Sequence, residues 1–205
     1  MGKPVLLIND DQISNGSAIS VHAWERDLQT DLVRFLVQPN DDVLELGLGL
    51  GMAYREIEKL RPKSHVVVEL SADVIAFHLA RRRKILGLII GDWRDVVDGF
   101  ENTSFDVVYY DADPPNLMEF DGGLEASWSF VEDAIQQCHR ILRQRGRLGF
   151  LDFSCMISMD IEKKNQIRDQ GYEIETKPIS IHPPRECSYA TSEFCHIVKL
   201  TKNRL

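Results

Sequence analysis

The sequence predicts an α/β fold: a seven-stranded, mostly parallel sheet with helices on both faces and an antiparallel last strand. Apolar runs of strand length alternate with longer amphipathic stretches, and this alternation is typical of a parallel sheet. The early apolar runs carry few polar residues, as strands covered on both faces must, whereas the run 193–200 mixes both kinds. A chain of 205 residues can bury one full core, so we expect 1–205 to form a single domain.

Each expected element has its own signal. The run 42–46 is apolar and ends in a glycine turn, and the runs 65–70 and 105–111 are valine-containing strands that end in acidic residues. The run 193–200 is expected at an edge of the sheet or antiparallel to its neighbours. The other strands are expected near 86–90, 146–152 and 173–180, and helices near 22–37, 52–61, 72–84, 93–99, 124–144 and 158–170.

Composition and charge narrow the class of protein. Apolar residues make up 43% and charged residues 27% of the chain, which is ordinary for a globular protein. The net charge of −8 disfavours nucleic-acid binding, and the basic run 81–84 is expected to end a helix. The four cysteines show no C-x-x-C spacing and are expected to be free thiols, and the histidines show no ligand spacing, so no metal is expected.

The sequence carries no export or membrane signal. No apolar run is long enough to span a bilayer, and the apolar part of the N-terminus is too short for a signal peptide. We therefore expect a cytoplasmic protein that binds a small molecule, without nucleic acid or membrane as a partner. The sequence leaves open whether it forms a homodimer.

The most informative segment is the glycine turn 47–51. Gly47, Gly49 and Gly51 alternate with leucines, and glycine allows positive φ and close approach of a ligand to the backbone. The spacing G-x-G-x-G, with Glu45 two residues upstream, differs from the G-x-G-x-x-G of dinucleotide-binding turns, whose ligand is an anion. The acid indicates a cationic ligand, although the glycines alone also fit an ordinary tight turn.

Acidic residues also end the next strands, at the edge where open parallel sheets bind ligands. Glu69, with Leu70 beside it, comes about twenty residues after the glycine turn, where a carboxylate can accept both ribose hydroxyls of an adenosine. Asp92 and Trp93 offer an acceptor and an aromatic plane for adenine, although Trp93 fits equally well as a core residue. These features predict a Rossmann-like nucleoside site.

Three further motifs point to the second reactant. They are Trp24-Glu25, Tyr110-Asp111 followed by Pro114, and Pro183-Pro184-Arg185-Glu186-Cys187-Ser188-Tyr189. With the glycine turn, Glu69 and Gly91-Asp92-Trp93, their order and spacing resemble class I S-adenosylmethionine-dependent methyltransferases. The resemblance is narrower to guanidinoacetate N-methyltransferase and related guanidino N-methyltransferases, and it spans roughly residues 18–200.

The resemblance implies S-adenosylmethionine as cofactor, with Glu45 near its cationic methionine part, and N-methylation of the guanidino group of a small molecule. It implies that Asp111 is the general base and that Glu25 also contacts the guanidine. It further implies that 1–40 is a segment that caps the substrate. The substrate-binding residues that it implies are Trp24, Tyr110 and Tyr189.

The chemistry of a guanidine is consistent with two carboxylates. A guanidinium is protonated at pH 7, so its nitrogen is a poor nucleophile until a proton is withdrawn and the planar fork is held in place. Glu25 and Asp111 could pair with the fork and leave one nitrogen aimed at the methyl group. The alternative is structural: Glu25 as a first-turn helix acid, and Asp111 as a cap for the following segment.

Two places depart from the family pattern. Asp113 stands where the related enzymes typically have an aromatic residue, and its charge predicts either a substrate more cationic than guanidinoacetate or an altered orientation of the substrate. In the family, backbone amides after the fifth strand receive the substrate carboxylate. The matching residues here, Phe153 and Ser154, are counted as substrate-binding, but they lie beside an additional acid, Asp152.

Other functions stay open at this point. An aminopropyltransferase would share the fold and an acid-x-acid-proline element such as 111–114, and a methyltransferase of another amine would share the cofactor site. A catalytically silent nucleoside-binding interaction protein would keep the fold without the chemistry. The sequence also leaves open whether one or two methyl groups are added, and whether a protein arginine is the substrate.

Overall fold

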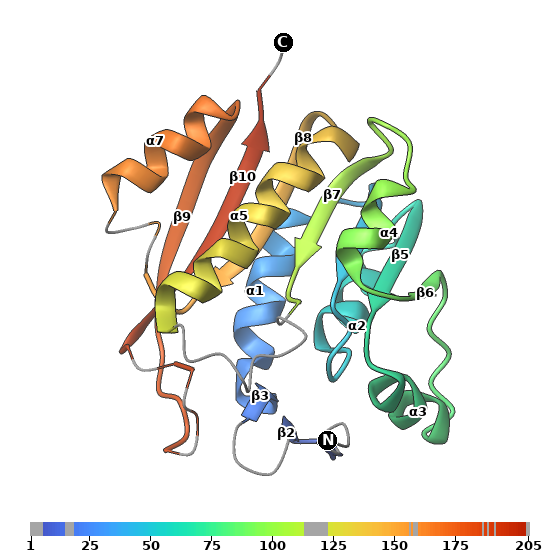
Figure 1. The fold of residues 1–205 in the computed structure, drawn as a ribbon. Coiled ribbons are helices and arrows are strands. Elements are labelled where there is room, and N and C mark those ends of the chain that lie inside the picture. The colour runs from blue at the N-terminus through green and yellow to red at the C-terminus, as the bar shows by residue number, and fades with distance from the viewer. Residues whose placement is uncertain are drawn as a thin grey trace.

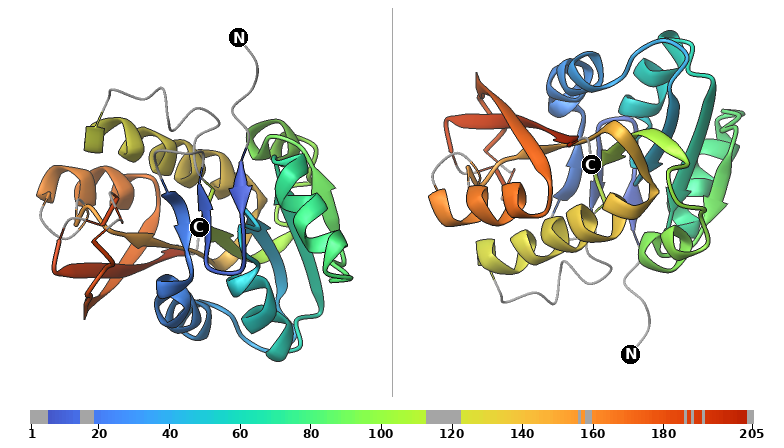
Figure 2. Two further views of the ribbon diagram at one scale, coloured as in Figure 1. Left: turned by 90° about the horizontal axis from the view of Figure 1, so that it is seen from below. Right: turned by 90° about the horizontal axis from the view of Figure 1, so that it is seen from above.

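A seven-stranded sheet forms the centre of the molecule, with helices on both faces (Figures 1 and 2). The structure is a computed structural model and describes residues 6–14, 19–112, 123–155, 157, 160–185, 187, 189–190 and 192–203. The strand order is β6-β5-β4-β7-β8-β10-β9. The predicted α/β class with a mostly parallel sheet is confirmed.

Five strands run parallel, and the last strand is antiparallel. The parallel strands are β4 (Asp42–Leu46), β5 (Ser64–Glu69), β6 (Leu88–Ile90), β7 (Phe105–Tyr110) and β8 (Leu142–Asp152). Strand β10 (Phe194–Lys202) is antiparallel to both β8 and β9 (Tyr172–Ser180). The antiparallel prediction is confirmed, but the edge alternative is wrong: β10 is hydrogen-bonded on both sides, and the edge strand is β9, whose side chains are mostly exposed.

Among the described residues, three helices cover each face of the sheet. Helices α1 (Arg26–Leu36), α2 (Met52–Lys59) and α3 (Ala72–Ala80) pack on one face, where Val43, Val107 and Tyr109 form part of the core. Helices α4 (Trp93–Asp98), α5 (Gly123–Ile141) and α7 (Ile161–Asp169) pack on the other face, over Leu44 and Val108. Successive strand residues point to opposite faces, so both sides of the central strands are apolar.

Several boundaries differ from the expectation: β8 begins at Leu142, not near 146, and α3 ends at Ala80, not near 84. Two further differences have a clear physical reason. Helix α5 ends at Ile141, not near 144, because the buried Leu142 already pairs with Phe105 of β7. The helix expected from residue 22 begins with a 3-10 turn, η1 (Ala23–Glu25). His22 caps this turn by accepting from the Trp24 amide, and the Glu25 carboxylate accepts from the His22 amide.

The N-terminal sheet, strands β1 (Leu7–Ile8), β2 (Gln12–Ser14) and β3 (Ile19–His22), was not predicted. Strands of two to four residues are too short to give a periodic signal. This sheet lies at the carboxyl edge of the large sheet (Figure 1). Ile13 packs in one core cluster with Leu48 and Leu50 of the glycine turn, so the N-terminal segment covers that turn directly.

The remaining compositional predictions have simple structural counterparts. All four cysteines are buried free thiols. Arg81 follows the last residue of α3, and its guanidinium lies 3.8 Å from the Phe77 ring centroid and 3.1 Å from Asp10. The basic run therefore follows the end of a helix and does not form its last turn, since the helix expected to reach residue 84 ends at Ala80; the run joins this helix to the N-terminal sheet. Within the described part of the chain, every helix is too short or too polar to cross a bilayer.

Candidate active site

The glycine turn between β4 and α2 adopts the backbone geometry expected of it. Gly47, Gly49 and Gly51 have φ values of 93°, 48° and 68°, in the left-handed region that favours glycine. A Cβ atom on Gly47 would lie 2.2 Å from the carbonyl oxygen of Asp111. The turn is thus pressed against the end of β7, and only glycine fits at its first position.

Glu69 holds the glycine turn through hydrogen bonds. Its Oε2 accepts from the backbone amides of Leu48 at 2.9 Å and Gly49 at 3.4 Å, and its Oε1 accepts from the Ser71 amide at 2.7 Å. The carboxylate therefore lies at the carboxyl edge beside the turn, where a ribose contact was expected. The expected ribose contact remains a prediction, since the amides occupy this carboxylate in the structure.

Next to Glu69, two large apolar side chains face solvent. Leu70 is 47% exposed and Ile90, at the end of the adjacent strand, is 65% exposed. Exposed apolar side chains beside a carboxylate suit the faces of an adenine ring. Trp93 is only 7% exposed, and its ring packs edge-on against Tyr110 with the ring centroids 5.7 Å apart. Trp93 is therefore a core residue, which was the alternative that the sequence left open.

Asp92 has a structural role of its own. Its side chain caps α4 by accepting from the Arg94 amide, and it pairs with the Arg94 guanidinium at 2.6 Å. These hydrogen bonds lower the pKa of Asp92. Part of the carboxylate remains exposed, and an adenine contact stays a prediction.

Glu45 lies inside the protein. It is 0% exposed, and its Oε2 is 2.8 Å from Nε2 of His65 on β5. Burial raises the pKa of Glu45, and the bond from His65 opposes this effect. This placement gives no direct support to the expected contact with the methionine part of the cofactor.

Asp111 follows β7 at the carboxyl edge, and Gln29 of α1 holds it. The Gln29 amide nitrogen donates to Asp111 Oδ2 at 2.9 Å. Asp111 is exposed as a residue, but desolvation of its carboxyl group by the surrounding protein, together with the charge of the Glu45 carboxylate, raises its pKa to about 7. A carboxylate with a pKa near neutrality is suited to accept a proton.

Glu25 and Tyr189 meet at the same edge. The Tyr189 hydroxyl donates to the buried Glu25 carboxylate, and burial, together with the charge of Glu25, raises the pKa of Tyr189. Phe153 packs edge-on against both Trp24, at 5.9 Å, and Tyr189, at 5.5 Å. The structure thus brings together four of the predicted substrate-side residues from three distant parts of the chain.

The rest of the predicted substrate side is placed differently. Ser154 donates to Asp152 at 2.7 Å, and the Ile157 amide donates to the other Asp152 oxygen at 3.0 Å. The Asp152 carboxylate therefore lies in the loop after β8, where a substrate carboxylate was expected to bind. Tyr110 is buried on the opposite face, against Trp93. Asp113 lies outside the described residues.

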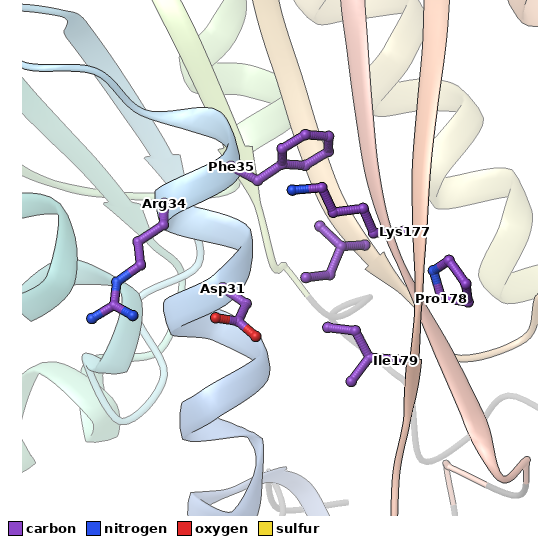
Figure 3. Close-up of a pocket in the computed structure, with 7 residues that line it drawn as sticks. Asp31, Arg34, Phe35, Lys177, Pro178 and Ile179 are labelled. Carbon is purple, nitrogen blue, oxygen red and sulfur yellow. The ribbon is translucent and has the colours of Figure 1, made fainter.

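A groove of about 420 Å³ lies elsewhere, between α1 and strands β9 and β10 (Figure 3). Lys177 extends over the Phe35 ring there, with its ammonium 3.7 Å from the ring centroid. None of the predicted site residues lines this groove. We therefore locate the chemistry at the carboxyl edge and not in this groove.

The sequence analysis missed Gln29, Ile90 and the contact of Glu45 with His65. Gln29 had a usable signal, because it lies four residues after Glu25 and so on the same helix face. Ile90 directly precedes Gly91-Asp92 and could have been read as an apolar strand end. The Glu45 contact depends on the register between β4 and β5, which no local pattern specifies.

Comparison with known proteins gives a consistent family. The model of the family described as guanidinoacetate N-methyltransferase matches residues 16–202. Protein arginine N-methyltransferase 2 of Emericella nidulans is 26% identical over 184 residues, covering 83% of this chain and 40% of that protein. The chain thus spans about two fifths of the length of this curated relative.

Solved structures show the same fold. The N-methyltransferase NodS from Bradyrhizobium japonicum is similar with a TM-score of 0.61 and 15% identity, covering 88% of this chain and 97% of that one. M. jannaschii TYW2 in complex with AdoMet has a TM-score of 0.58 and 16% identity, covering 100% of this chain and 89% of that one. At these identities the likeness concerns the fold alone.

Gly47→Ala tests the role of the glycine turn. The new Cβ would meet the Asp111 carbonyl at a positive φ, so we expect the free energy of unfolding to fall by about 1–3 kcal/mol. The affinity for S-adenosylmethionine, measured by calorimetry, should fall about tenfold or more. Gly99→Ala is the control, because Gly99 has a φ of −79°; equal effects of both substitutions would refute the proposed fit of the turn.

Proposed function

The chain belongs to the guanidinoacetate N-methyltransferase family and is an S-adenosylmethionine-dependent methyltransferase, and we propose that its acceptor is a guanidino nitrogen of a small molecule. The observation that carries this proposal is the convergence of two carboxylates, Asp111 and Glu25, at the carboxyl edge. Glu25 and Gln29 lie one helical turn apart, and Gln29 is bonded to Asp111. Two carboxylates are the groups that a planar, cationic fork requires.

The residues present fit S-adenosylmethionine. The glycine turn has the left-handed backbone that glycine allows, Glu69 lies where ribose hydroxyls would be received, and Leu70 and Ile90 offer apolar cover for adenine. When bound, this cofactor supplies a methyl group on a positively charged sulfur. We propose that Glu69, Leu70, Asp92 and the glycine turn hold it beside Asp111.

In the proposed reaction, Asp111 and Glu25 hold the guanidinium and expose one nitrogen. That nitrogen forms a bond to the methyl carbon as the bond from carbon to sulfur breaks, and the sulfur leaves as a neutral thioether. Asp111 accepts the proton that the nitrogen loses, so charge and atoms balance. Trp24, Phe153 and Tyr189, with the N-terminal segment 1–40, would exclude water from the substrate.

Gln29 is proposed as a positioning residue. Its amide donates to one oxygen of Asp111 and carries no charge, so it fixes the carboxylate without neutralising it. We propose that the second oxygen, to which none of the described residues donates a hydrogen bond, receives the substrate. Tyr189 fixes Glu25 in a comparable way from the opposite side.

The acidic surroundings favour a substrate without a carboxylate of its own. Asp152 occupies the loop after β8 through Ser154 and the Ile157 amide, and a second anion there would be repelled. We propose a guanidine more cationic than guanidinoacetate. A protein arginine is the second candidate, favoured by the name of the relative from Emericella nidulans.

Mass spectrometry of the reaction with methyl-labelled S-adenosylmethionine tests the proposal. We expect a labelled guanidino nitrogen in a panel of guanidinoacetate, arginine, agmatine and arginine-containing peptides, with the cationic members preferred. Asp111→Asn should lower the rate at least about a hundredfold, because the base is lost. Measurable cofactor binding without transfer to any guanidine would contradict the proposed acceptor, and aminopropyl transfer from the decarboxylated cofactor would identify the rival reaction.

The pH dependence provides a separate test. The base must be unprotonated, and its pKa is raised to about 7, so kcat/KM should fall about tenfold per pH unit below pH 7 and level off above it. A profile that stays flat down to pH 5 would show that no group like Asp111 accepts the proton. The acid limb should be absent from the residual rate of Asp111→Asn.

Gln29→Leu removes the donor to Asp111 but keeps an apolar side chain of similar size. We expect kcat to fall about tenfold while the dissociation constant of S-adenosylmethionine changes less than twofold, since Gln29 acts only on Asp111. Gln38→Leu, at an exposed position beyond the same helix, is the control. Equal kcat values in the two variants would exclude a positioning role for Gln29.

A further inference from the structure

Glu45 is a buried acid that the proposed reaction does not use. It lies on β4, in register with Tyr109 of β7, and both side chains lie on the face covered by α1 and α2. Asp111 follows Tyr109 by two residues and therefore points to the same face, where α1 contacts it. Glu45, Tyr109 and Asp111 thus form a row across two neighbouring strands.

His65 and Glu58 extend this row away from Asp111. His65 Nε2 is 2.8 Å from Glu45, and its Nδ1 is 2.9 Å from Glu58 of α2. The Tyr54 ring stacks on the imidazole at 4.9 Å. Burial alone would lower the pKa of His65, but the two carboxylates outweigh burial and raise it, so the imidazole is best satisfied as a donor to both.

Two polar atoms in the middle of the row have no hydrogen-bond partner among the described residues. They are Oε1 of Glu45 and the hydroxyl of Tyr109, and both side chains are fully buried. One is an acceptor and the other is a donor. Leaving such groups buried costs about 1–3 kcal/mol each, so packing alone does not explain them.

Electrostatics connects the row to Asp111. Burial raises the pKa of Tyr109, as do the charges of Asp111, Glu45 and Glu25. Burial is the largest cause of the raised pKa of Asp111, and the charge of Glu45 is the second. Within the part of the chain that the structure describes, the titratable groups around Asp111 are Tyr109 on β7, Glu45 on β4 with His65 and Glu58 behind it, Glu25 on η1, Tyr189 after β9, and, beyond Glu25, Asp152 at the end of β8 and Cys195 on β10.

We propose that Glu45, held by His65, is a positioning residue that acts through space on Asp111 across the Tyr109 hydroxyl, and does not bind the cofactor. The hydrogen bond from His65 favours the ionised form of Glu45, against the effect of burial, and the negative charge of that form disfavours a second negative charge at Asp111 and so keeps Asp111 a stronger base. Tyr109 acts in the opposite sense, because its hydroxyl can donate to the ionised carboxylate. The catalytic significance of this effect rests on the proposed function.

Titration of the Asp111 carboxyl by carbon-13 NMR tests the proposal without any activity assay. The full chain is labelled at aspartate carboxyl carbons, and the Asp111 signal is assigned by its loss in Asp111→Asn. In Glu45→Gln, which keeps an oxygen for His65, we expect the proton affinity of Asp111 to fall on the order of tenfold. In Tyr109→Phe, which fills the same space, it should rise measurably.

The matched control is Glu162→Gln, which removes an exposed carboxylate on α7 and should leave the Asp111 titration unchanged. Cofactor affinity is measured in parallel: a change of less than twofold in Glu45→Gln is expected. An unchanged Asp111 titration with cofactor binding weakened tenfold would overturn the proposal and return Glu45 to the cofactor site. If Glu45→Gln does not fold, Tyr109→Phe decides alone, and an unchanged titration there overturns the proposal.

The enzymatic readout separates this inference from the proposed function. The acid limb of the kcat/KM profile should move to lower pH in Glu45→Gln, with the KM for the cofactor unchanged. A shifted NMR titration without transfer to any guanidine would refute the proposed acceptor and leave the electrostatic role of Glu45 intact. Transfer to a guanidine, with neither the Asp111 NMR titration nor the acid limb of the pH profile shifted in Glu45→Gln, would support the proposed acceptor and refute the electrostatic role of Glu45.

Discussion

The close contact between Gly47 and the backbone of Asp111 is the constraint on which the site depends. The absence of a side chain at Gly47 lets the glycine turn and the end of β7 meet, and the Asp111 amide donates to the Leu46 carbonyl at 2.9 Å. The turn that we propose receives the cofactor and the carboxylate that we propose as base are therefore fixed by one another. A methyl donor and an acceptor held in such a relation need little further ordering, which can supply several kcal/mol of catalysis.

Around this contact, each acid is held by a different kind of partner. Backbone amides fix Glu69, the Gln29 amide fixes Asp111, a phenol fixes Glu25, and an imidazole fixes Glu45. Only Asp111, which has a neutral donor and a raised pKa, combines access to solvent with the basicity that a proton acceptor needs.

The sequence predicted those parts of the molecule that depend on local patterns. Short runs of contiguous residues indicate the central strands, the glycine turn and the acids that end the strands. The motif around Tyr189 was informative because its particular order of residues matches a family pattern. The N-terminal sheet was missed because its strands are very short. The partners of Glu45 and Asp111 were missed because they depend on register and helix placement, which arise only when distant segments pack together.

Two predicted ligand contacts, those of Trp93 and Tyr110, show that a sequence motif does not specify which way a single side chain points. Trp93 and Tyr110 were assigned to ligands by their place in a motif, and the structure buries both against one another. Tyr110 ends β7, and strand alternation turns its side chain to the face opposite Tyr109, whereas Trp93 begins α4, which packs on that same face. Exposed Leu70 and Ile90 therefore suit the adenine better than the buried Trp93.

The central claim is that a guanidine is held between Asp111 and Glu25 beside the sulfur of the cofactor. A crystal structure of the full chain with S-adenosylhomocysteine and the preferred guanidine would test it most directly. The account predicts the guanidino group within hydrogen-bond distance of both carboxylates, with one nitrogen facing the sulfur across the space of a methyl group. A guanidine bound elsewhere, or oriented with its nitrogens away from Asp111, would contradict the account.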